Sequence, residues 1–248
     1  MIETKVISLQ RTPERLETFA QQNSHLTYSV FSAIEGAEVS ETSRLRFIDP
    51  NYIYRPGALG NAMSHQILWN EIVTQNKPMT ICEDDAIFHK DFALLSQRII
   101  ETLPEDWDVC LWGFNLDSLL YCFMPEKLST CCMRFNQDDV RNNYPDYIKS
   151  DIQSAPFQLI QALGTICYSM SPKGAKIFLS QTQPIRRMNV FFPCLARDLE
   201  NVALDISMNA FYGINKSYVA FPPLVITKNE IESSTVQSRT SKKVGLYI

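Results

Sequence analysis

Apolar and polar positions alternate in blocks along the first half of the chain. Four short apolar runs predict buried strands, at 5–9, 27–31, 79–82 and 108–113. Between them, apolar side chains at helical spacing predict one helix beginning at Pro13, one over 61–75 and one over 92–103. Strands and helices that alternate at this length are typical of an α/β domain with a largely parallel sheet.

The rest of the chain is less regular. Residues 37–56 and 114–155 show no clear period, and the polar stretch 136–150 predicts an exposed excursion or lid. A strand is expected at 164–170, followed by a helix that begins near Ser171. The segment from Glu230 has few apolar residues and is expected to be a flexible tail. We predict a single domain over residues 1–248.

Composition narrows the class of protein. The 248 residues are 45% hydrophobic and 20% charged, typical of a soluble globular protein. The formal net charge of -4 argues against a nucleic-acid partner bound through a basic surface. No signal peptide and no run of 18 apolar residues is found, so a cytoplasmic protein without a transmembrane segment is expected. The seven cysteines lack metal-ligand spacing and are expected to be reduced.

Three adjacent acids, Glu83, Asp84 and Asp85, directly follow the strand predicted at 79–82. Adjacent carboxylates repel one another unless a cation or solvent relieves the repulsion. Ligands of α/β sheets bind at the carboxyl ends of strands, and oxygen ligands suit Mg²⁺ or Mn²⁺ holding a diphosphate. The alternative is an ordinary solvated turn or helix start. These residues alone leave open which acid reaches the metal.

A helix start with two glycines is the second candidate site. Gly57 and Gly60 permit the close approach of a phosphate to a helix N-terminus. Ser64 and His65 follow in the first turns, where they would reach a nucleotide. The alternative is a plain helix start with a capped histidine, because the segment matches neither a Walker loop nor a GxGxxG fingerprint.

Several segments, taken in order, carry a family resemblance. They are Val6-Ile7-Ser8-Leu9-Gln10-Arg11 with Glu14-Arg15, Phe31-Ser32-Ala33-Ile34-Glu35-Gly36, Gly57-x-x-Gly60-x-x-x-Ser64-His65-x-x-x-Trp69, Ile81-Cys82-Glu83-Asp84-Asp85-Ala86, and the weaker elements Trp107-Asp108-Val109, Gly164-Thr165-x-x-Tyr168, Leu204-Asp205 and Phe221-Pro222-Pro223. Together they resemble glycosyltransferase family 25, the bacterial lipooligosaccharide-synthesis glycosyltransferases. Asn61 stands where the family signature usually has Cys. The resemblance covers about residues 5–235, and 114–155 matches poorly.

The resemblance implies a GT-A-like fold with a mostly parallel central sheet flanked by helices. About 1–113 would bind the nucleotide sugar, and about 114–235 would form the acceptor side with an irregular excursion, followed by a flexible tail over 236–248. It also implies an inverting transfer of a hexose, galactose or glucose, from a UDP-hexose donor to a saccharide acceptor such as the lipooligosaccharide core. That acceptor would be met at the cytoplasmic face of the inner membrane, through a peripheral contact.

The resemblance assigns roles to particular residues. It makes Glu83 and Asp85 the metal site for Mn²⁺ or Mg²⁺, with Asp85 as the principal ligand. Asp205 is the first choice for the base that takes the acceptor proton, and Asp198 and Asp151 are further candidates. The implied donor-binding residues are Ser8, Leu9, Arg11, Arg15, Ser64, His65 and Asp84.

Two other functions fit the acids. Clustered carboxylates also serve metal-dependent nucleotidyl or phosphoryl transfer, which would act on nucleoside triphosphates without a sugar acceptor. A noncatalytic module that binds nucleotide sugars would bind its donor without any effect of metal and would release no UDP.

Overall fold

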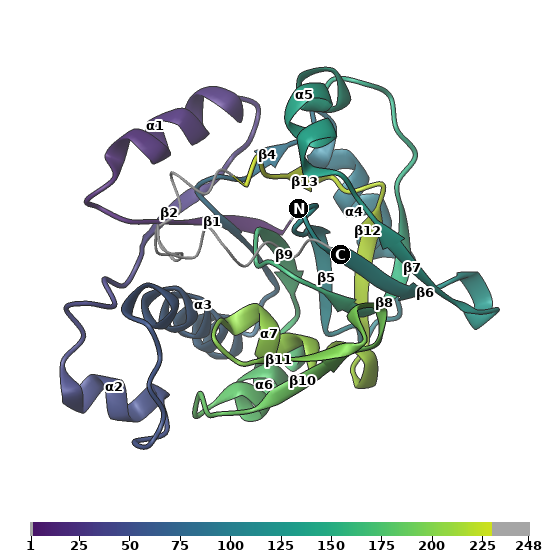
Figure 1. The fold of residues 1–248 in the computed structure, drawn as a ribbon. Coiled ribbons are helices and arrows are strands. Elements are labelled where there is room, and N and C mark those ends of the chain that lie inside the picture. Colours follow the sequence, from purple (N-terminus) through teal and green to yellow (C-terminus); the bar gives the residue numbers. More distant parts are fainter. Residues whose placement is uncertain (1, 230–248) are drawn as a thin grey trace.

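The computed structural model describes residues 2–229 (Figure 1). Its elements in chain order are β1 (Glu3–Ser8), α1 (Pro13–Gln22), β2 (Ser29–Ser32), α2 (Glu41–Phe47), α3 (Pro56–Gln75), β3 (Met79–Glu83), β4 (Ile87–Phe88), α4 (Phe92–Thr102), β5 (Val109–Gly113), β6 (Leu119–Phe123), β7 (Thr130–Arg134), α5 (Gln137–Tyr147), β8 (Ala155–Ala162), β9 (Cys167–Met170), α6 (Pro172–Thr182), β10 (Asn189–Phe192), β11 (Arg197–Glu200), α7 (Leu204–Asn209), β12 (Ser217–Phe221) and β13 (Val225–Ile226).

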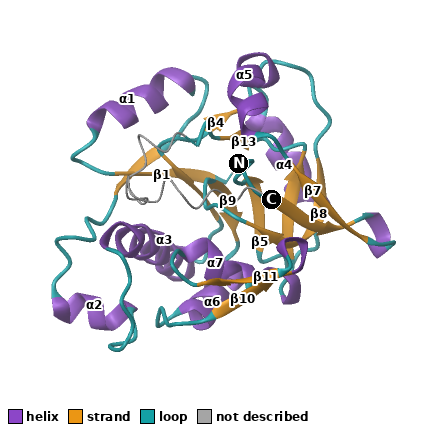
Figure 2. Ribbon diagram, viewed as in Figure 1, coloured by secondary structure: helices purple, strands orange, loops and turns teal. Residues whose placement is uncertain are grey.

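One large sheet organises the described part of the chain. Within residues 2–229 it has nine strands in the order β2-β1-β3-β9-β5-β12-β8-β6-β7 (Figure 2). The pairs β1–β2, β1–β3 and β5–β12 are parallel, and the remaining pairs are antiparallel. The α/β class is confirmed, and the arrangement agrees with a GT-A-like fold. The sheet is mixed because β9 enters antiparallel between β3 and β5, and because β8, β6 and β7 form an antiparallel end.

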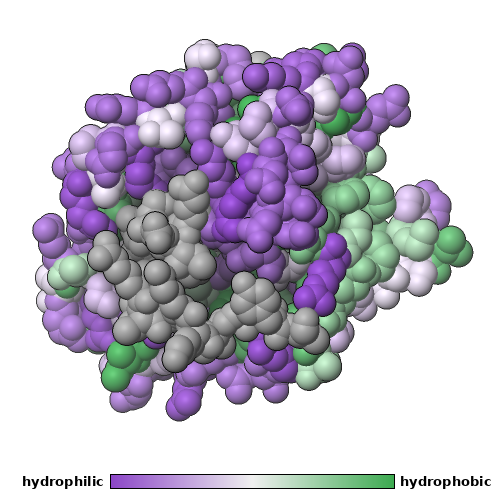
Figure 3. All heavy atoms as spheres, turned by 45° about the horizontal axis from the view of Figure 1, so that its top comes forward, coloured by the Kyte–Doolittle hydropathy of each residue, from purple (hydrophilic) through white to green (hydrophobic). Residues whose placement is uncertain are grey.

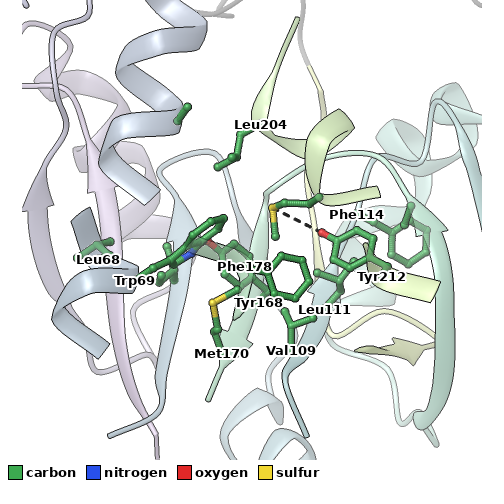
Figure 4. Close-up of a cluster of buried hydrophobic side chains, with 14 of the residues drawn as sticks. Leu68, Trp69, Val109, Leu111, Phe114, Tyr168, Met170, Phe178, Leu204 and Tyr212 are labelled. Atoms are coloured by element: carbon green, nitrogen blue, oxygen red, sulfur yellow. Dashed lines mark hydrogen bonds between the residues drawn. The ribbon is translucent and has the colours of Figure 1, made fainter. Parts of the chain in front are cut away.

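Helices cover both faces of this sheet. On β1 the adjacent residues Val6 and Ile7 belong to different hydrophobic clusters, as strand alternation requires. The cluster on the Ile7 side includes side chains of α3, α6 and α7, and Figure 4 shows part of it, with Trp69, Tyr168 and Phe178 packed together. The cluster on the Val6 side includes residues of α1 and α4. The two predicted parts of the domain therefore share one sheet and its two cores.

Several elements were not predicted. A short helix, α2, lies within the irregular stretch 37–56, and α3 begins at Pro56, five residues before the predicted start at 61. The stretch 136–150, expected to be an exposed excursion, contains the helix α5, which is held against the end of the described chain. There Gln137 and Arg141 donate hydrogen bonds to the backbone carbonyl of Lys228, and Tyr147 donates to that of Pro223.

The surface is mainly polar around α5, and apolar side chains gather beside it over the β6–β7 hairpin (Figure 3). Leu128, at the tip of that hairpin, is 80% exposed. Among residues 2–229 no helix is both long and apolar enough to cross a membrane. The flexible tail predicted over 236–248 lies outside the described residues.

Candidate active site

The first and third strands bring the candidate residues to one edge of the sheet. Parallel pairing sets Ile7 of β1 opposite Glu83 of β3, so the residues after each strand emerge side by side. β2 runs parallel to β1 on its other side, with Ser8 opposite Ser32. Carboxyl ends of parallel strands therefore meet here, as ligand sites of α/β sheets require.

Two hollows flank the acids at this edge. The first, a pocket of about 260 Å³ that we call the donor pocket, is lined by Ile7, Leu9, Arg11, Arg15, Ala33, Ile34, Glu35, Gly36, Ala37, Pro56, Gly57, Asn61, Glu83 and Asp84. The second, of about 170 Å³, is lined by Glu14, Arg15, Thr18, Gln22, Asp84, Asp85, Ile87, Thr227, Lys228 and Asn229. Arg15 and Asp84 line both hollows, so they stand at the junction between them.

Asp84 is held by the N-terminal segment. Its Oδ2 accepts a hydrogen bond of 2.8 Å from Ser8 Oγ, and its Oδ1 accepts one of 2.8 Å from Arg15 Nε. Burial lowers the pKa of Arg15, but the hydrogen bond to Asp84 and the negative charges of Asp84, Asp85 and Glu83 together raise it above its ordinary value. Ser8, Arg15 and Asp84, all predicted to bind the donor, are thus brought together. Asp84 orients Arg15 within the site.

Glu83 sits in a cradle of donors beside the donor pocket. Its Oε1 accepts hydrogen bonds from Thr165 Oγ1 at 2.5 Å and Asn61 Nδ2 at 3.2 Å, and His65 Nε2 lies 3.6 Å away. Burial would raise the pKa of Glu83, but the nearby His65 and the bonds from Thr165 and Asn61 lower it to about 2. Within residues 2–229 no hydrogen bond reaches Oε2, so Glu83 keeps one charged oxygen for a ligand.

Two aromatic residues hold the side chain of His65 in place: Tyr168 contacts it directly, and Trp69 contacts Tyr168. Trp69 Nε1 donates to the Tyr168 hydroxyl at 2.7 Å, and that hydroxyl lies 2.7 Å from His65 Nδ1. The Tyr168 hydroxyl thus accepts from Trp69 and contacts the Nδ1 side of the His65 ring, so that Nε2 faces Glu83. His65 is fully buried, so its position supports Glu83. Direct contact of His65 with a donor stays a prediction.

Ser64 ties α3 to the wall of the donor pocket. Its Oγ donates to the Gly60 carbonyl at 2.7 Å and accepts from the Ile34 backbone N–H at 2.9 Å. The side chain is fully buried. Ser64 thereby holds the 33–37 segment that lines the pocket, and its predicted contact with a donor also stays a prediction.

Asp85 is the most accessible of the three acids. Its side chain is 40% exposed, and Arg15 Nη2 lies 3.9 Å from its Oδ2. Crowding by surrounding protein atoms and the charges of Glu83 and Asp84 raise the pKa of Asp85 to about 7, against the opposing charge of Arg15. In the absence of a cation the acids thus repel one another as the sequence predicted.

The carboxylates at this edge of the sheet suit a hard cation that takes most of its ligands from phosphates and water. Among residues 2–229 no group of three or more Asp, Glu, His or Cys side chains is arranged to hold a metal ion. Mg²⁺ commonly uses one or two carboxylates and completes its shell with substrate phosphates and water. The carboxylates of Glu83 and Asp85 are of the kind that this mode of binding uses, but Glu83 lines the donor pocket whereas Asp85 lines the second hollow. The two arginines that line the donor pocket suit a diphosphate.

The three candidate bases lie in different surroundings. Asp205, in the first turn of α7, accepts hydrogen bonds from the backbone N–H of Gly164 at 2.8 Å and of Ile206 at 2.9 Å. Burial raises its pKa against these bonds, and the charge of Glu83 adds to the rise. Asp198 is exposed on the β10–β11 hairpin. Asp151 is 98% exposed and pairs with Lys90. Of the three, Asp205 is the acid connected to Glu83, because the neighbours Gly164 and Thr165 bond to Asp205 and to Glu83 respectively.

Sequence reasoning missed three residues that build the site. Asn61 and Thr165 bond directly to Glu83, and Tyr168 orients His65. Both Thr165 and Tyr168 lie in a motif that carried the family resemblance, but their partners are about a hundred residues away and no local pattern reveals them. Asn61 could be noticed only as a departure from the family signature.

The fold and pocket define an α/β protein with a pocket at the carboxyl ends of parallel strands, the place where such sheets bind nucleotides. The family model for glycosyltransferase family 25 (LPS biosynthesis protein) matches residues 1–198. The chain belongs to this glycosyltransferase family, as the sequence motifs indicated. No curated protein matches the chain. Asp205 lies beyond the matched residues.

Proposed function

We propose that the protein is an inverting, metal-dependent hexosyltransferase that moves galactose or glucose from a UDP-hexose to a lipooligosaccharide core or related saccharide. The observation that carries the proposal is the donor pocket, in which Arg11 and Arg15 stand beside Glu83 and Asp84, with Asp85 exposed next to them. Arginine side chains suited to a diphosphate and carboxylates suited to a metal ion therefore lie together at one edge of the sheet.

In this proposal the residues divide the work. Arg11 and Arg15 bind and orient the diphosphate, and the cradle formed by Asn61, Thr165 and His65 keeps Glu83 ionised and fixed. Mn²⁺ or Mg²⁺, held by Asp85 and Glu83, would neutralise charge that builds on the leaving UDP. Asp205 takes the proton of the acceptor hydroxyl, and its raised pKa suits that task.

The test compares UDP release by the parent protein and by Asp85→Ala, with UDP-galactose, UDP-glucose, Mn²⁺ and a lipooligosaccharide core acceptor. We expect metal-dependent release in the parent and its loss in the variant. The melting temperature should stay close to that of the parent, since Asp85 is 40% exposed. Asp106→Ala is the matched control, because it removes an acid of similar exposure that lines neither hollow. Normal turnover by Asp85→Ala would show that the metal assignment is wrong.

A further inference from the structure

One surface of the described chain is rich in arginine. Residues 44–56 and 183–188 together contain five arginines and a single acid, Asp49, although the whole chain has a formal net charge of -4. Backbone contacts join the two segments: Ile48 and Ile185 form a β-bridge, and the Asp49 N–H donates to the Ile185 carbonyl at 2.8 Å. We call this surface the arginine face. It lies along the lower side of the molecule in Figure 1, where α2 and the β10–β11 hairpin are found.

Three of these arginines have no acidic partner in the part of the chain that the structure describes. Arg44 and Arg187 form ion pairs with nearby glutamates. Arg46, Arg55 and Arg186 are exposed, and within residues 2–229 none of them forms an ion pair. Positive charges collected on one surface repel one another, and an anionic partner relieves that repulsion. Guanidinium groups bind phosphate oxygens in pairs, so a surface that bears phosphate groups suits this face.

Apolar side chains stand exposed among the arginines. Ile53 is 90% exposed, whereas its neighbours Tyr52 and Tyr54 are buried, so the extended segment turns Ile53 toward solvent. Leu45 and Val202 are each about half exposed. Val202 adjoins the arginine face because the Tyr52 hydroxyl donates to the backbone carbonyl of the residue before it. The face therefore combines unpaired cations with aliphatic side chains that only a partner would remove from water.

Charge separates this face from the apolar tip of the β6–β7 hairpin. Leu128 at that tip is 80% exposed, but residues 124–130 around it carry one acid and one base and hence no net charge. The combination on the arginine face also distinguishes kinds of partner. A soluble polyanion offers nothing to Ile53, and an apolar protein surface offers nothing to the arginines. A bilayer that contains anionic lipids offers phosphate groups and acyl chains together.

We infer that the arginine face docks on a membrane surface that contains anionic phospholipids, with its arginines at the phosphate groups and Ile53 inserted beneath them. Arg55 directly precedes Pro56 and Gly57, which line the donor pocket. Docking by this face therefore holds a wall of the donor pocket close to the lipid surface. The inference is independent of the transfer reaction proposed above, because docking requires neither donor nor acceptor.

The test measures co-sedimentation of the protein with vesicles of pure phosphatidylcholine and with vesicles of equal parts phosphatidylcholine and phosphatidylglycerol. We expect the parent to bind the anionic vesicles alone, and less tightly as the salt concentration is raised. Arg186→Gln should weaken binding about fivefold, the usual share of one basic side chain at an anionic membrane. Ile53→Ser should weaken it about tenfold, because an aliphatic side chain no longer leaves water.

Two control variants make the same chemical changes elsewhere. Arg98→Gln removes an exposed arginine from α4, which packs on the Val6 side of the sheet, whereas the arginine face packs on the Ile7 side through Ile48. Leu128→Ser removes the exposed leucine of the hairpin tip. Both should bind anionic vesicles as the parent does. All four variants should keep the melting temperature of the parent, because the substituted side chains are exposed.

Several results would overturn the inference. A parent protein that does not sediment with anionic vesicles lacks the membrane contact, and binding of dextran sulfate in its place would assign the face to soluble polyanions. Loss of binding in Leu128→Ser but not in Ile53→Ser would move the contact to the hairpin tip, and equal binding by all variants would show that the arginine face is not the contact. Failure of the proposed function has a different signature, since vesicle binding would then persist in a protein that releases no UDP.

Discussion

Glu83, Asp84 and Asp85 are adjacent in the chain, but the fold gives each a different environment. Asp84 is bonded through both oxygens to Ser8 and Arg15, and Glu83 has one oxygen saturated by donors. Asp85 is the most exposed of the three, and the ion pair that it forms within residues 2–229 is a long one, with Arg15 Nη2 at 3.9 Å. The charge repulsion inferred from the sequence is thus relieved for the first two acids and concentrated on the third.

The repulsion that falls on Asp85 raises the pKa of that residue, and this predicts that metal binding depends on pH. In the metal-free protein Asp85 has a pKa of about 7, above the ordinary value for Asp, so it holds a proton at lower pH. A ligand carboxylate must lose its proton to bind a cation, so binding below that pKa releases one proton. We expect the Mn²⁺ affinity to fall by about tenfold per pH unit below 7 and to level off above it. Calorimetry in buffers of different ionisation enthalpy would measure the released proton. An affinity that is flat between pH 5.5 and 8 would contradict the prediction.

Asp205 gives the second prediction at this scale. Asp205→Asn keeps an oxygen that accepts a hydrogen bond from Gly164 but removes the proton acceptor. We expect donor binding to be retained while kcat for transfer falls by about 10²- to 10⁴-fold, the usual contribution of a general base. Donor affinity by calorimetry and single-turnover transfer separate the two effects. Asp198→Asn serves as the exposed control, and equal rates in Asp205→Asn and the parent would remove Asp205 from the base role.

The elements that the sequence predicted correctly are those with a strong local pattern. The strands β3 and β5, and the second half of β1, are short runs buried on both faces, and α3 and α4 repeat apolar side chains at helical spacing. The helix α5 is polar and contains Pro145, so its own pattern predicts a loop. It is stabilised by bonds to Lys228 and Pro223, far along the chain, which no window of sequence displays.

The candidate site shows the same contrast between features with a local sequence pattern and features that depend on distant residues. The position of the acids after an apolar strand was enough to predict that they lie at the carboxyl end of a strand in the sheet, where the two hollows are found. The partners of those acids come from 76 residues away for Ser8 and Asp84 and from 82 residues away for Thr165 and Glu83. Only the pairing of β1 with β3, and of β3 with β9, brings them together. The structure was therefore needed to distinguish Asp84, which orients Arg15, from Asp85, whose carboxylate is exposed.

The contact between α3 and the 34–36 segment leads to a prediction about an element. A Cβ added at Gly60 would lie 2.2 Å from the Ile34 carbonyl oxygen and 2.8 Å from the Gly36 nitrogen. Gly60→Ala must therefore push this wall of the donor pocket away from the helix. We expect a loss of about 1–3 kcal/mol in the free energy of unfolding, together with weaker UDP binding.

A matched glycine supplies the control. At Gly213 an added Cβ would meet Ile160 Cγ2 at 3.5 Å, an ordinary contact, so Gly213→Ala should leave UDP affinity unchanged. Chemical denaturation and calorimetry of the two variants would measure both effects. If Gly60→Ala bound UDP as tightly as the parent, the 33–37 segment would have no part in holding the nucleotide.

At the scale of the whole molecule, donor binding should appear as a change in global stability. Residues of β1, β3, α1 and α3 and of the 33–37 segment line the donor pocket, so a ligand there would connect the sheet with helices on both of its faces. A ligand that binds only the folded protein stabilises it by about 2.7 kcal/mol at a hundred times its Kd. For a chain of this length we expect the melting temperature to rise by roughly 5–10 °C.

The pattern of that rise distinguishes the possible functions. With a UDP-hexose the shift should be large in the presence of Mn²⁺ and small without it, because Asp85 repels the diphosphate unless a cation lies between them. A nucleotidyl or phosphoryl transferase would respond to nucleoside triphosphates at least as strongly, and a noncatalytic module would respond to the donor equally with and without metal. The Asp85→Ala variant sharpens the comparison, since it removes the repulsion together with the metal ligand. Without metal it should therefore show a larger shift than the metal-free parent, and Mn²⁺ should no longer increase that shift. A shift that still grew with Mn²⁺ would place the metal elsewhere.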